Sequence, residues 1–187
     1  MRKKVVSIIG NRDTKEGEKK YELAYETGKL LVDKGYRVQT GGLHGIMEAA
    51  LKGAHASKNY KEGDTIALVP SFNTEQANEY ADIVIPTGLD VMRNAIVANA
   101  DAVIGIGGGS GTMCEYAYAW AMKRLVLAFK NSGGWSEKLA DTCLDDYPRY
   151  DFDGDKVFGV ETAKEALEII EKNIDKYVLR HQGIKGE

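Results

Sequence analysis

Two glycine-rich stretches of the sequence each stand between an apolar run and a run of helical periodicity. The second stretch, GGGSGT, occupies residues 107–112 and precedes an alanine-rich run. The first N–H groups of a helix lack intrahelical acceptors and lie at the positive end of its dipole, so such a turn suits an anion such as phosphate. The first stretch, GGLHG at residues 41–45, repeats the arrangement. Together, two facing glycine turns could hold a phosphate and the sugar or ring attached to it.

Charged side chains must contribute to such a site. A helix dipole supplies about 0.3–1 kcal/mol at an exposed position, whereas even millimolar binding needs about 4 kcal/mol. Arg12 and Arg93 are the cations best placed to strengthen the binding of an anion there. The candidate ligand-binding residues are Gly10, Arg12, Gly41, Gly42, Gly45, Gly107, Gly108, Gly109, Ser110, Gly111 and Thr112.

Two common nucleotide motifs do not fit the second glycine stretch. A Walker loop needs a lysine before its final Ser or Thr, and Gly111 precedes Thr112 instead. The dinucleotide fingerprint G-x-G-x-x-G, counted from Gly105 or Gly107, ends on Ser110 or Thr112. These mismatches disfavour a P-loop phosphotransferase and a nicotinamide or flavin dehydrogenase.

Short β-branched runs alternate with longer segments of 3.6-residue periodicity along the chain, which predicts a parallel sheet flanked by helices. We expect a Rossmann-like, doubly wound and mainly parallel α/β sheet of about seven strands. The expected strands fall at residues 4–10, 36–42, 64–70, 82–88, 101–109, 124–131 and 156–160. Ligands of such sheets bind beyond the carboxyl ends of the strands. Both glycine stretches and Arg12 follow expected strands, so they should meet there.

Helix boundaries follow from capping patterns and periodicity. Thr162 and Glu165 have the spacing of a capping box ahead of the last helix, and Thr112 and Glu115 have the same spacing. Two further helices are expected over residues 89–99 and 136–144.

Composition limits the classes of function. The 187 residues fit one domain, residues 1–187, with a flexible tail at 179–187. The 25 basic and 28 acidic residues are well mixed and leave a net charge of −3, which argues against nucleic acid or an anionic membrane as a partner. No apolar run approaches a membrane span of about 20 residues. We expect a cytoplasmic protein without a metal site, in which Cys114 is a buried apolar side chain.

The segment GGGSGTMCE resembles the PGGxGTxxE signature of the LOG-like family of the SLOG superfamily, once called lysine decarboxylases. GGLHGIMEAA resembles an earlier glycine motif of that family, and VMRN lies where its members carry an arginine–lysine pair. The likeness spans roughly residues 3–130. It implies a homodimer or homotetramer that cleaves the N-glycosidic bond of nucleoside 5′-monophosphates to free base and ribose 5-phosphate, with no cofactor required. It places phosphate on Gly108, Gly109, Gly111 and Thr112, and gives catalytic roles to Arg93 and Glu115.

Three positions depart from the LOG pattern. Gly107 replaces the signature proline, Asn94 replaces the lysine, and Glu48 stands where a small residue is usual. In these features the chain is similar to a neighbouring SLOG branch that includes the molybdenum cofactor carrier proteins, which bind a phosphorylated pterin. Glu48 and Asn94 are therefore further candidates for ligand contacts. His44 is another, because it lies in the first glycine stretch and could approach a leaving base.

Two functions stay open on the sequence. One is a nucleotide phosphoribohydrolase, in which Glu115 stabilises the positive charge that develops on the ribose or activates water, while Arg93 orients the phosphate. The other is a non-catalytic binding or carrier protein for a nucleotide or phosphorylated pterin. Each residue also has a structural interpretation, Glu115 as a helix cap and Arg93 as a surface side chain. A pyridoxal phosphate decarboxylase is disfavoured because no lysine is placed to carry that cofactor.

Overall fold

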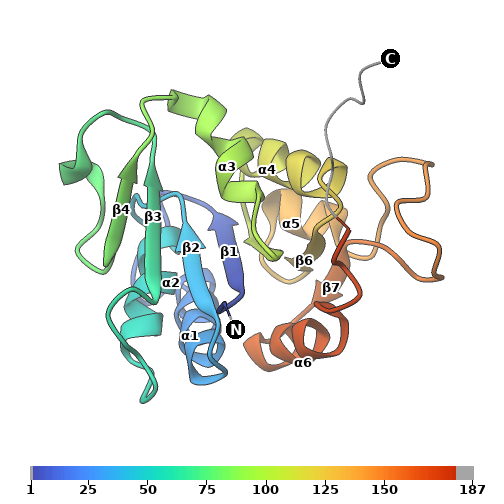
Figure 1. The fold of residues 1–187 in the computed structure, drawn as a ribbon, viewed down its shortest axis with the longest axis horizontal. Coiled ribbons are helices and arrows are strands. Elements are labelled where there is room, and N and C mark those ends of the chain that lie inside the picture. The colour runs from blue at the N-terminus through green and yellow to red at the C-terminus, as the bar shows by residue number, and fades with distance from the viewer. Residues whose placement is uncertain (1, 180–187) are drawn as a thin grey trace.

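A computed structural model describes residues 2–179 of the chain (Figure 1). The expected flexible tail, apart from Leu179, lies outside the described residues. Seven strands form one sheet in the order β4-β3-β2-β1-β5-β6-β7, and every recorded strand pair is parallel. The strands are β1 (Val5–Gly10), β2 (Arg37–Thr40), β3 (Thr65–Val69), β4 (Ile83–Pro86), β5 (Ala102–Ile106), β6 (Leu125–Phe129) and β7 (Phe158–Val160). The predicted doubly wound Rossmann-like fold is confirmed. The sheet was expected to be mainly parallel, and all of these strand pairs are parallel.

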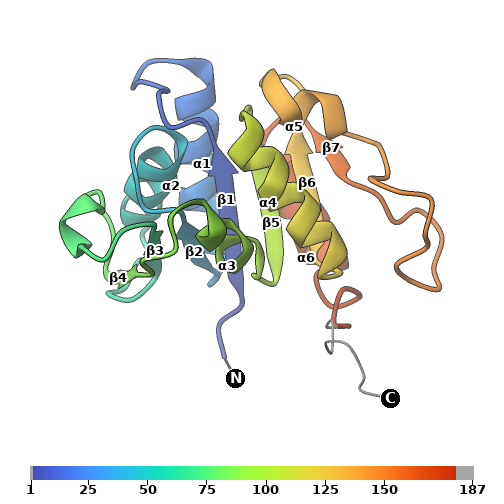
Figure 2. The same cartoon turned by 90° about the horizontal axis from the view of Figure 1, so that it is seen from above.

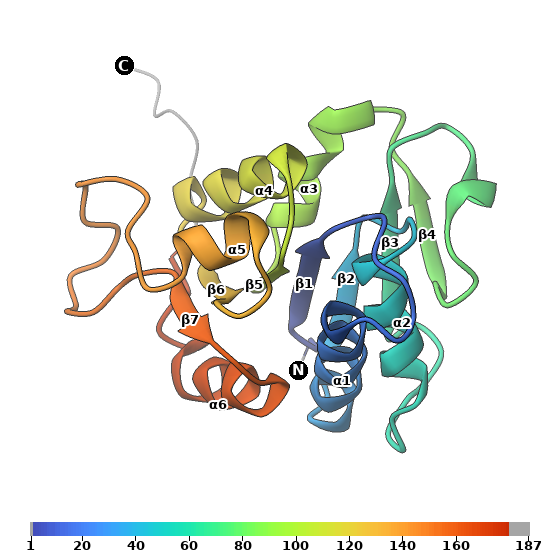
Figure 3. The ribbon, with the colours of Figure 1, turned by 180° about the vertical axis from the view of Figure 1, so that it is seen from behind.

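Helices cover both faces of the sheet, as Figures 1 and 2 show. One face carries α1 (Lys19–Asp33), α2 (Ile46–His55) and α6 (Ala163–Asn173), and the other carries α3 (Asn94–Ala98), α4 (Ser110–Ala121) and α5 (Gly134–Leu139). Figure 3 shows the first group from behind. Strand alternation divides the core accordingly. Val6 and Ile8 pack on the side of α1 and α2, whereas Ile9 packs with Val97 and Trp120 on the opposite side.

The order of the strands reverses between β1 and β5. From β1 the chain adds β2, β3 and β4 on one side of the sheet, and from β5 it adds β6 and β7 on the other. The register pairs Gly10 with Ile106, so the turns that follow these two strands begin side by side. In doubly wound sheets this reversal opens the crevice in which ligands bind.

Two predicted helices differ from those observed. The segment 89–99 contains a 3₁₀ turn, η2 (Asp90–Arg93), followed by the short α3. Asp90 has φ 48°, which excludes an α-helix that starts at residue 89. The helix expected at 136–144 spans residues 134–139 instead. It ends there because Asp141 donates its N–H to Val157 O at 2.8 Å, which draws the chain toward β7.

The capping box of the last helix is confirmed. Thr162 is the N-cap of α6, and its hydroxyl accepts from Glu165 N at 3.2 Å. The Glu165 carboxylate accepts from Glu161 N at 2.8 Å, so both partners contribute to the first turn. This helix begins where its local sequence predicts.

None of the helices within residues 2–179 is long and apolar enough to cross a bilayer. No group of three or more His, Cys, Asp or Glu side chains within the same residues is arranged to hold a metal ion.

Candidate functional site

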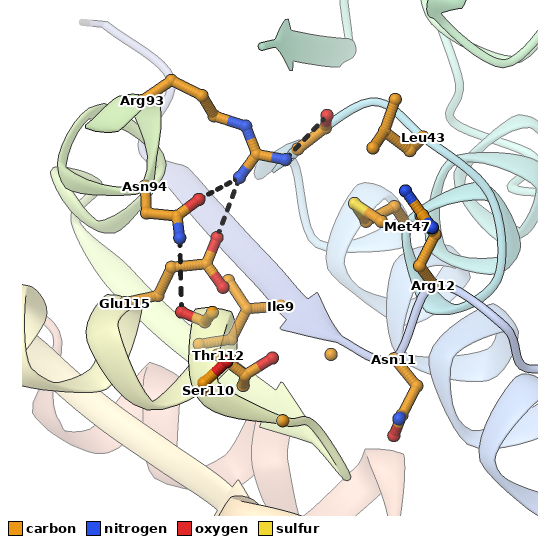
Figure 4. Close-up of a pocket in the computed structure, with 14 residues that line it drawn as sticks. Ile9, Asn11, Arg12, Leu43, Met47, Arg93, Asn94, Ser110, Thr112 and Glu115 are labelled. Carbon is orange, nitrogen blue, oxygen red and sulfur yellow. Dashed lines mark hydrogen bonds and ion pairs between the residues drawn. The ribbon is translucent and has the colours of Figure 1, made fainter. Parts of the chain in front are cut away.

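A cavity of about 480 Å³ lies at the carboxyl ends of β1, β2 and β5, where the strand order reverses (Figure 4). It is formed by the turns after β1 and β2, by η2 and the start of α3, and by the first turns of α4. Ten of the sequence candidates line it: Gly10, Arg12, Gly41, Arg93, Asn94, Gly109, Ser110, Gly111, Thr112 and Glu115. The volume lies within the range usual for small-molecule sites.

The N-terminus of α4 supplies donors to this cavity. Gly109 is the N-cap, with φ −100°, and the first recorded intrahelical bond runs from Met113 N to Gly109 O at 3.0 Å. The backbone N–H groups of residues 109–112 therefore lack intrahelical acceptors, and all four residues line the cavity. They form a row of donors at the positive end of the helix dipole.

The capping box predicted for Thr112 and Glu115 is wrong. Because α4 begins at Ser110, Thr112 is already its third residue, and the N-cap Gly109 has no side chain to accept a hydrogen bond. Glu115 is freed from the helix end and turns toward Arg93 (Figure 4). The expected burial of Cys114 is also wrong, because that position faces away from the sheet and is exposed.

Gly107 and Gly108 position the turn and do not line the cavity. Gly107 N donates to Ser132 Oγ at 2.8 Å, and Gly108 N donates to Asn11 Oδ1 at 2.7 Å. Gly107 O accepts from Ser136 N, and Gly108 O accepts from Trp135 N, both at 3.0 Å. These bonds anchor the glycine turn to β1 and to α5, so both peptide units are engaged within the protein.

Arg93 is buried, with 7% of its surface exposed, and its guanidinium contacts three elements. Nη1 donates to Glu115 Oε1 at 3.2 Å and to Asn94 Oδ1 at 2.5 Å, and Nη2 donates to Gly41 O at 3.3 Å. A Cβ atom on Gly41 would lie 2.4 Å from Nη2, so only glycine leaves room for the guanidinium at that turn. Its Nε is buried and has no acceptor among the described residues. The structure thus excludes the surface interpretation of Arg93.

Burial sets the electrostatics of the Arg93–Glu115 pair. Desolvation raises the pKa of Glu115 to about 7, although the positive charge of Arg93 opposes the shift. Desolvation also lowers the pKa of Arg93, opposed by Glu115. A carboxyl group of this pKa exchanges its proton near neutral pH, and each exchange changes the net charge beside the α4 N-terminus.

The remaining sequence candidates lie outside the cavity. Gly42 O accepts from Asn78 N at 2.9 Å, and Gly45, with φ 68°, is the N-cap of α2. His44 is exposed and Glu48 is half-buried, with Nδ1 and Oε2 3.1 Å apart. Asn94, in contrast, bridges the site, since its Nδ2 donates to Gly111 O at 3.4 Å.

Four lining residues are absent from the sequence candidates: Ile9, Asn11, Leu43 and Met47. Asn11 directly follows the end of β1, so the strand-end rule that selected Gly10 and Arg12 could have found it. The other three are apolar side chains that carry no chemical signal in the sequence.

Comparison with known proteins gives a family and several solved relatives. Residues 3–165 match the model of the SLOG cluster4 family. An uncharacterized protein of Archaeoglobus fulgidus is 36% identical over 126 residues, which cover 67% of this chain and 79% of that protein.

Two solved structures of molybdenum cofactor proteins are similar over most of the chain. The molybdenum cofactor binding protein of Rippkaea orientalis has a TM-score of 0.76 at 29% identity. The match covers 93% of this chain and 99% of that protein. The Moco carrier protein of Chlamydomonas reinhardtii has a TM-score of 0.73 at 26% identity. The match covers 94% of this chain and 99% of that protein.

Proposed function

The chain belongs to the SLOG cluster4 family, and from that premise we propose that it binds a phosphorylated pterin of the molybdenum cofactor class as a carrier, without chemical conversion. The observation that carries the proposal is the convergence of the free N–H groups of residues 109–112 and the buried Arg93 on one cavity. Similar folds that bind or carry the molybdenum cofactor support the choice of ligand class.

The phosphate of the ligand would occupy the N-terminus of α4. Four backbone donors and a helix dipole meet it there, and Arg93 and Arg12 add positive charge at the edge of the cavity. The carboxyl group of Glu115 would take up a proton as the anion arrives, because its pKa of about 7 is poised for that change. Loss of the negative charge on Glu115 leaves Arg93 free to pair with the phosphate. A resident metal or redox cofactor is not needed for this binding.

The small molecule that copurifies with the protein tests the ligand class. We expect mass spectrometry of the denatured, freshly purified protein to detect a phosphorylated pterin, and oxidation of the released material to give pterin fluorescence. Release of nucleoside monophosphates alone would contradict the pterin assignment.

Gly111 offers a test of the phosphate position. It is exposed, and a Cβ atom there would lie 3.6 Å from Asn94 Nδ2, an ordinary contact, so a side chain fits. We expect Gly111→Asp to weaken binding of ribose 5-phosphate more than about tenfold by charge repulsion, measured by isothermal titration calorimetry. An acidic residue in the first turn of a helix is favourable by about 0.3–1 kcal/mol, so the variant should remain folded.

The matched control is Gly111→Asn, which has the same shape without the charge. It should retain binding of ribose 5-phosphate within about threefold, since only the repulsive charge is missing. Equal loss in both variants would show that size rather than charge matters and would argue against a phosphate at this position.

Nucleotide phosphoribohydrolysis is a second candidate function, favoured by one observation. Glu115 lines the cavity next to the α4 N-terminus, and a pKa of about 7 suits a group that gives or takes a proton. Incubation with a panel of nucleoside 5′-monophosphates, followed by chromatography, distinguishes the two functions. Release of free base that disappears in Glu115→Gln would favour the hydrolase, whereas bound and unconverted monophosphates favour the carrier.

A further inference from the structure

A second cavity, of about 700 Å³, adjoins the first. Arg12 and Leu43 line both, so the two cavities are neighbours beyond the ends of the strands. The second cavity lies between the first glycine turn, the loop after β3 and the turn after β4. Its other lining residues include Phe72, Gly88 and Asp90. A ligand with its phosphate on α4 could extend into this space.

The Phe72 ring is an exposed aromatic surface in the second cavity. It is 89% exposed, although burial of a phenylalanine side chain is favourable. One part of the ring rests on the backbone of Gly88, where a Cβ atom would lie 2.3 Å from Phe72 Cε1. Gly88 also has φ 63°, so both the turn and the contact require glycine. The rest of the ring is open to a partner of the same flat shape.

The charges of the two cavities differ. The first has Arg12, Arg93 and the positive end of α4 against one carboxyl group, that of Glu115, whose raised pKa favours its neutral form. The second has the carboxylates of Glu75 and Asp90 against Arg12, and His44 also lines it. Carboxylates repel a phosphate and accept hydrogen bonds from N–H groups. A phosphorylated ring compound would therefore lie with its phosphate in the first cavity and its ring in the second.

Asp90 lies on the Arg93 side of the second cavity. It begins η2, which ends at Arg93, and its negative charge opposes the lowering of the Arg93 pKa that burial causes. The carboxylate of Glu75, in contrast, already accepts from Asn73 Nδ2 at 3.1 Å. Asp90 is thus the carboxylate better placed to meet a ligand that spans both cavities.

We propose that the second cavity selects a 2-amino-4-oxopyrimidine ring, the edge shared by pterins and guanine, by stacking on Phe72 and by hydrogen bonds to Asp90. This ring carries an amino N–H and a ring N–H side by side, and one carboxylate accepts from both. Adenine presents an unprotonated ring nitrogen beside a C–H at the corresponding edge, so it offers no such pair. The inference rests on the proposed function and adds the chemical identity of the ring.

Purine nucleotides are the probes for the test. Wild-type protein is titrated with GMP, AMP and ribose 5-phosphate by isothermal titration calorimetry. We expect GMP to bind about tenfold more tightly than AMP and than ribose 5-phosphate, in keeping with charge-assisted hydrogen bonds and a stacked ring. Ribose 5-phosphate reports the phosphate position alone.

Variants separate stacking from hydrogen bonding. Phe72→Ala should lower the affinity for GMP about tenfold and leave that for ribose 5-phosphate unchanged, whereas Phe72→Tyr should retain both. Asp90→Asn should remove the preference for GMP over AMP, and asparagine tolerates the positive φ at this position. The control Glu75→Gln should keep the preference. Phe72 and Asp90 are exposed, so these variants should fold.

The outcomes distinguish this inference from the function on which it rests. If ribose 5-phosphate binds but GMP binds no more tightly than AMP, or if Phe72→Ala leaves GMP binding intact, the ring assignment is wrong and the phosphate site stands. If Glu75→Gln rather than Asp90→Asn removes the preference, the assignment to Asp90 is wrong. If none of the three compounds binds, the proposed function fails and the ring assignment fails with it.

Discussion

Arg93 and Glu115 are a buried ion pair whose members both line the candidate site. Removing charged groups from water is expensive, and a pair at 3.2 Å offsets only part of that penalty. The high pKa of Glu115 expresses this balance, because burial favours its neutral form. An anion that arrives beside Arg93 would add to this preference for the neutral form of Glu115.

The pH dependence of stability tests the buried state of Glu115. Between pH 4.5 and 7 the unfolded chain ionises Glu115, whereas the folded protein keeps it protonated, so rising pH favours unfolding. We expect Glu115 to lower the free energy of unfolding by about 3 kcal/mol across this window and to add no further change above it. Urea denaturation at a series of pH values measures the effect.

Glu115→Gln is the control for that titration. The side chain keeps its shape and does not ionise, so the difference between wild type and variant should change with pH only between about 4.5 and 7. Asp82 and Asp141 have lowered pKa values, and their contributions change at more acidic pH in both proteins. Parallel curves for wild type and variant would mean that Glu115 has an ordinary pKa.

At the scale of elements, α1 and α2 cross in backbone contact beside the sheet. A Cβ atom on Gly28 would lie 2.0 Å from Ala50 O, and one on Gly53 would lie 1.9 Å from Tyr25 O. Both glycines are therefore required for the close approach of the helices. This crossing positions the start of α2 and, with it, the turn at residues 41–45.

Gly53→Ala tests the helix crossing. Alanine is favoured over glycine in a helix by about 1 kcal/mol, but the new methyl group would collide with the carbonyl group of Tyr25, and overpacking costs about 1–3 kcal/mol or more. We expect the clash to dominate and the free energy of unfolding to fall by about 1–3 kcal/mol, measured by urea denaturation.

Gly109→Ala is the control for the crossing experiment. No heavy atom lies within 4 Å of a Cβ atom at Gly109, and its φ of −100° suits alanine. This substitution adds no clash and should cost at most about 1 kcal/mol, because alanine is less favoured than glycine at an N-cap. A Gly53→Ala protein as stable as wild type would show that the helices can separate.

At the scale of the whole molecule, apolar side chains remain exposed around the site. Val91, Met92 and Ile96 lie on η2 and α3, and Met113 lies on α4, which packs against α3. Arg93 and Asn94 belong to the same segments and face the cavity. We propose that this surface is where copies of the chain meet in the homodimer or homotetramer expected from the sequence.

Light scattering tests the oligomer. We expect the wild-type protein to have the mass of two or four chains, and Met92→Glu to shift it toward the mass of one, because the substitution places a charge in an apolar contact. Tyr147→Glu, at an exposed position in the loop between α5 and β7, should leave the mass unchanged. A wild-type monomer at micromolar concentration would refute the oligomer.

The sequence by itself determined the parallel sheet and the chemistry at its edge. Strand propensity and helical periodicity are local signals, so the seven strands and the capping box at Thr162 could be read directly. Because parallel strands share one carboxyl edge, the same pattern brought Arg12 and both glycine stretches to one side of the molecule. The signature around Glu115 indicated the family.

Only the tertiary structure decided which groups face the ligand. Whether the N–H of Gly108 points to Asn11 or to the cavity depends on contacts far apart in the chain, as does the pairing of Glu115 with Arg93. The spacing of Thr112 and Glu115 predicted a capping box. Because α4 starts at Ser110, Glu115 lies inside the helix instead, where its side chain is buried. The second cavity likewise joins segments distant in sequence. Residue spacing reports neighbours within a turn or two, whereas a site is built by the packing of whole elements.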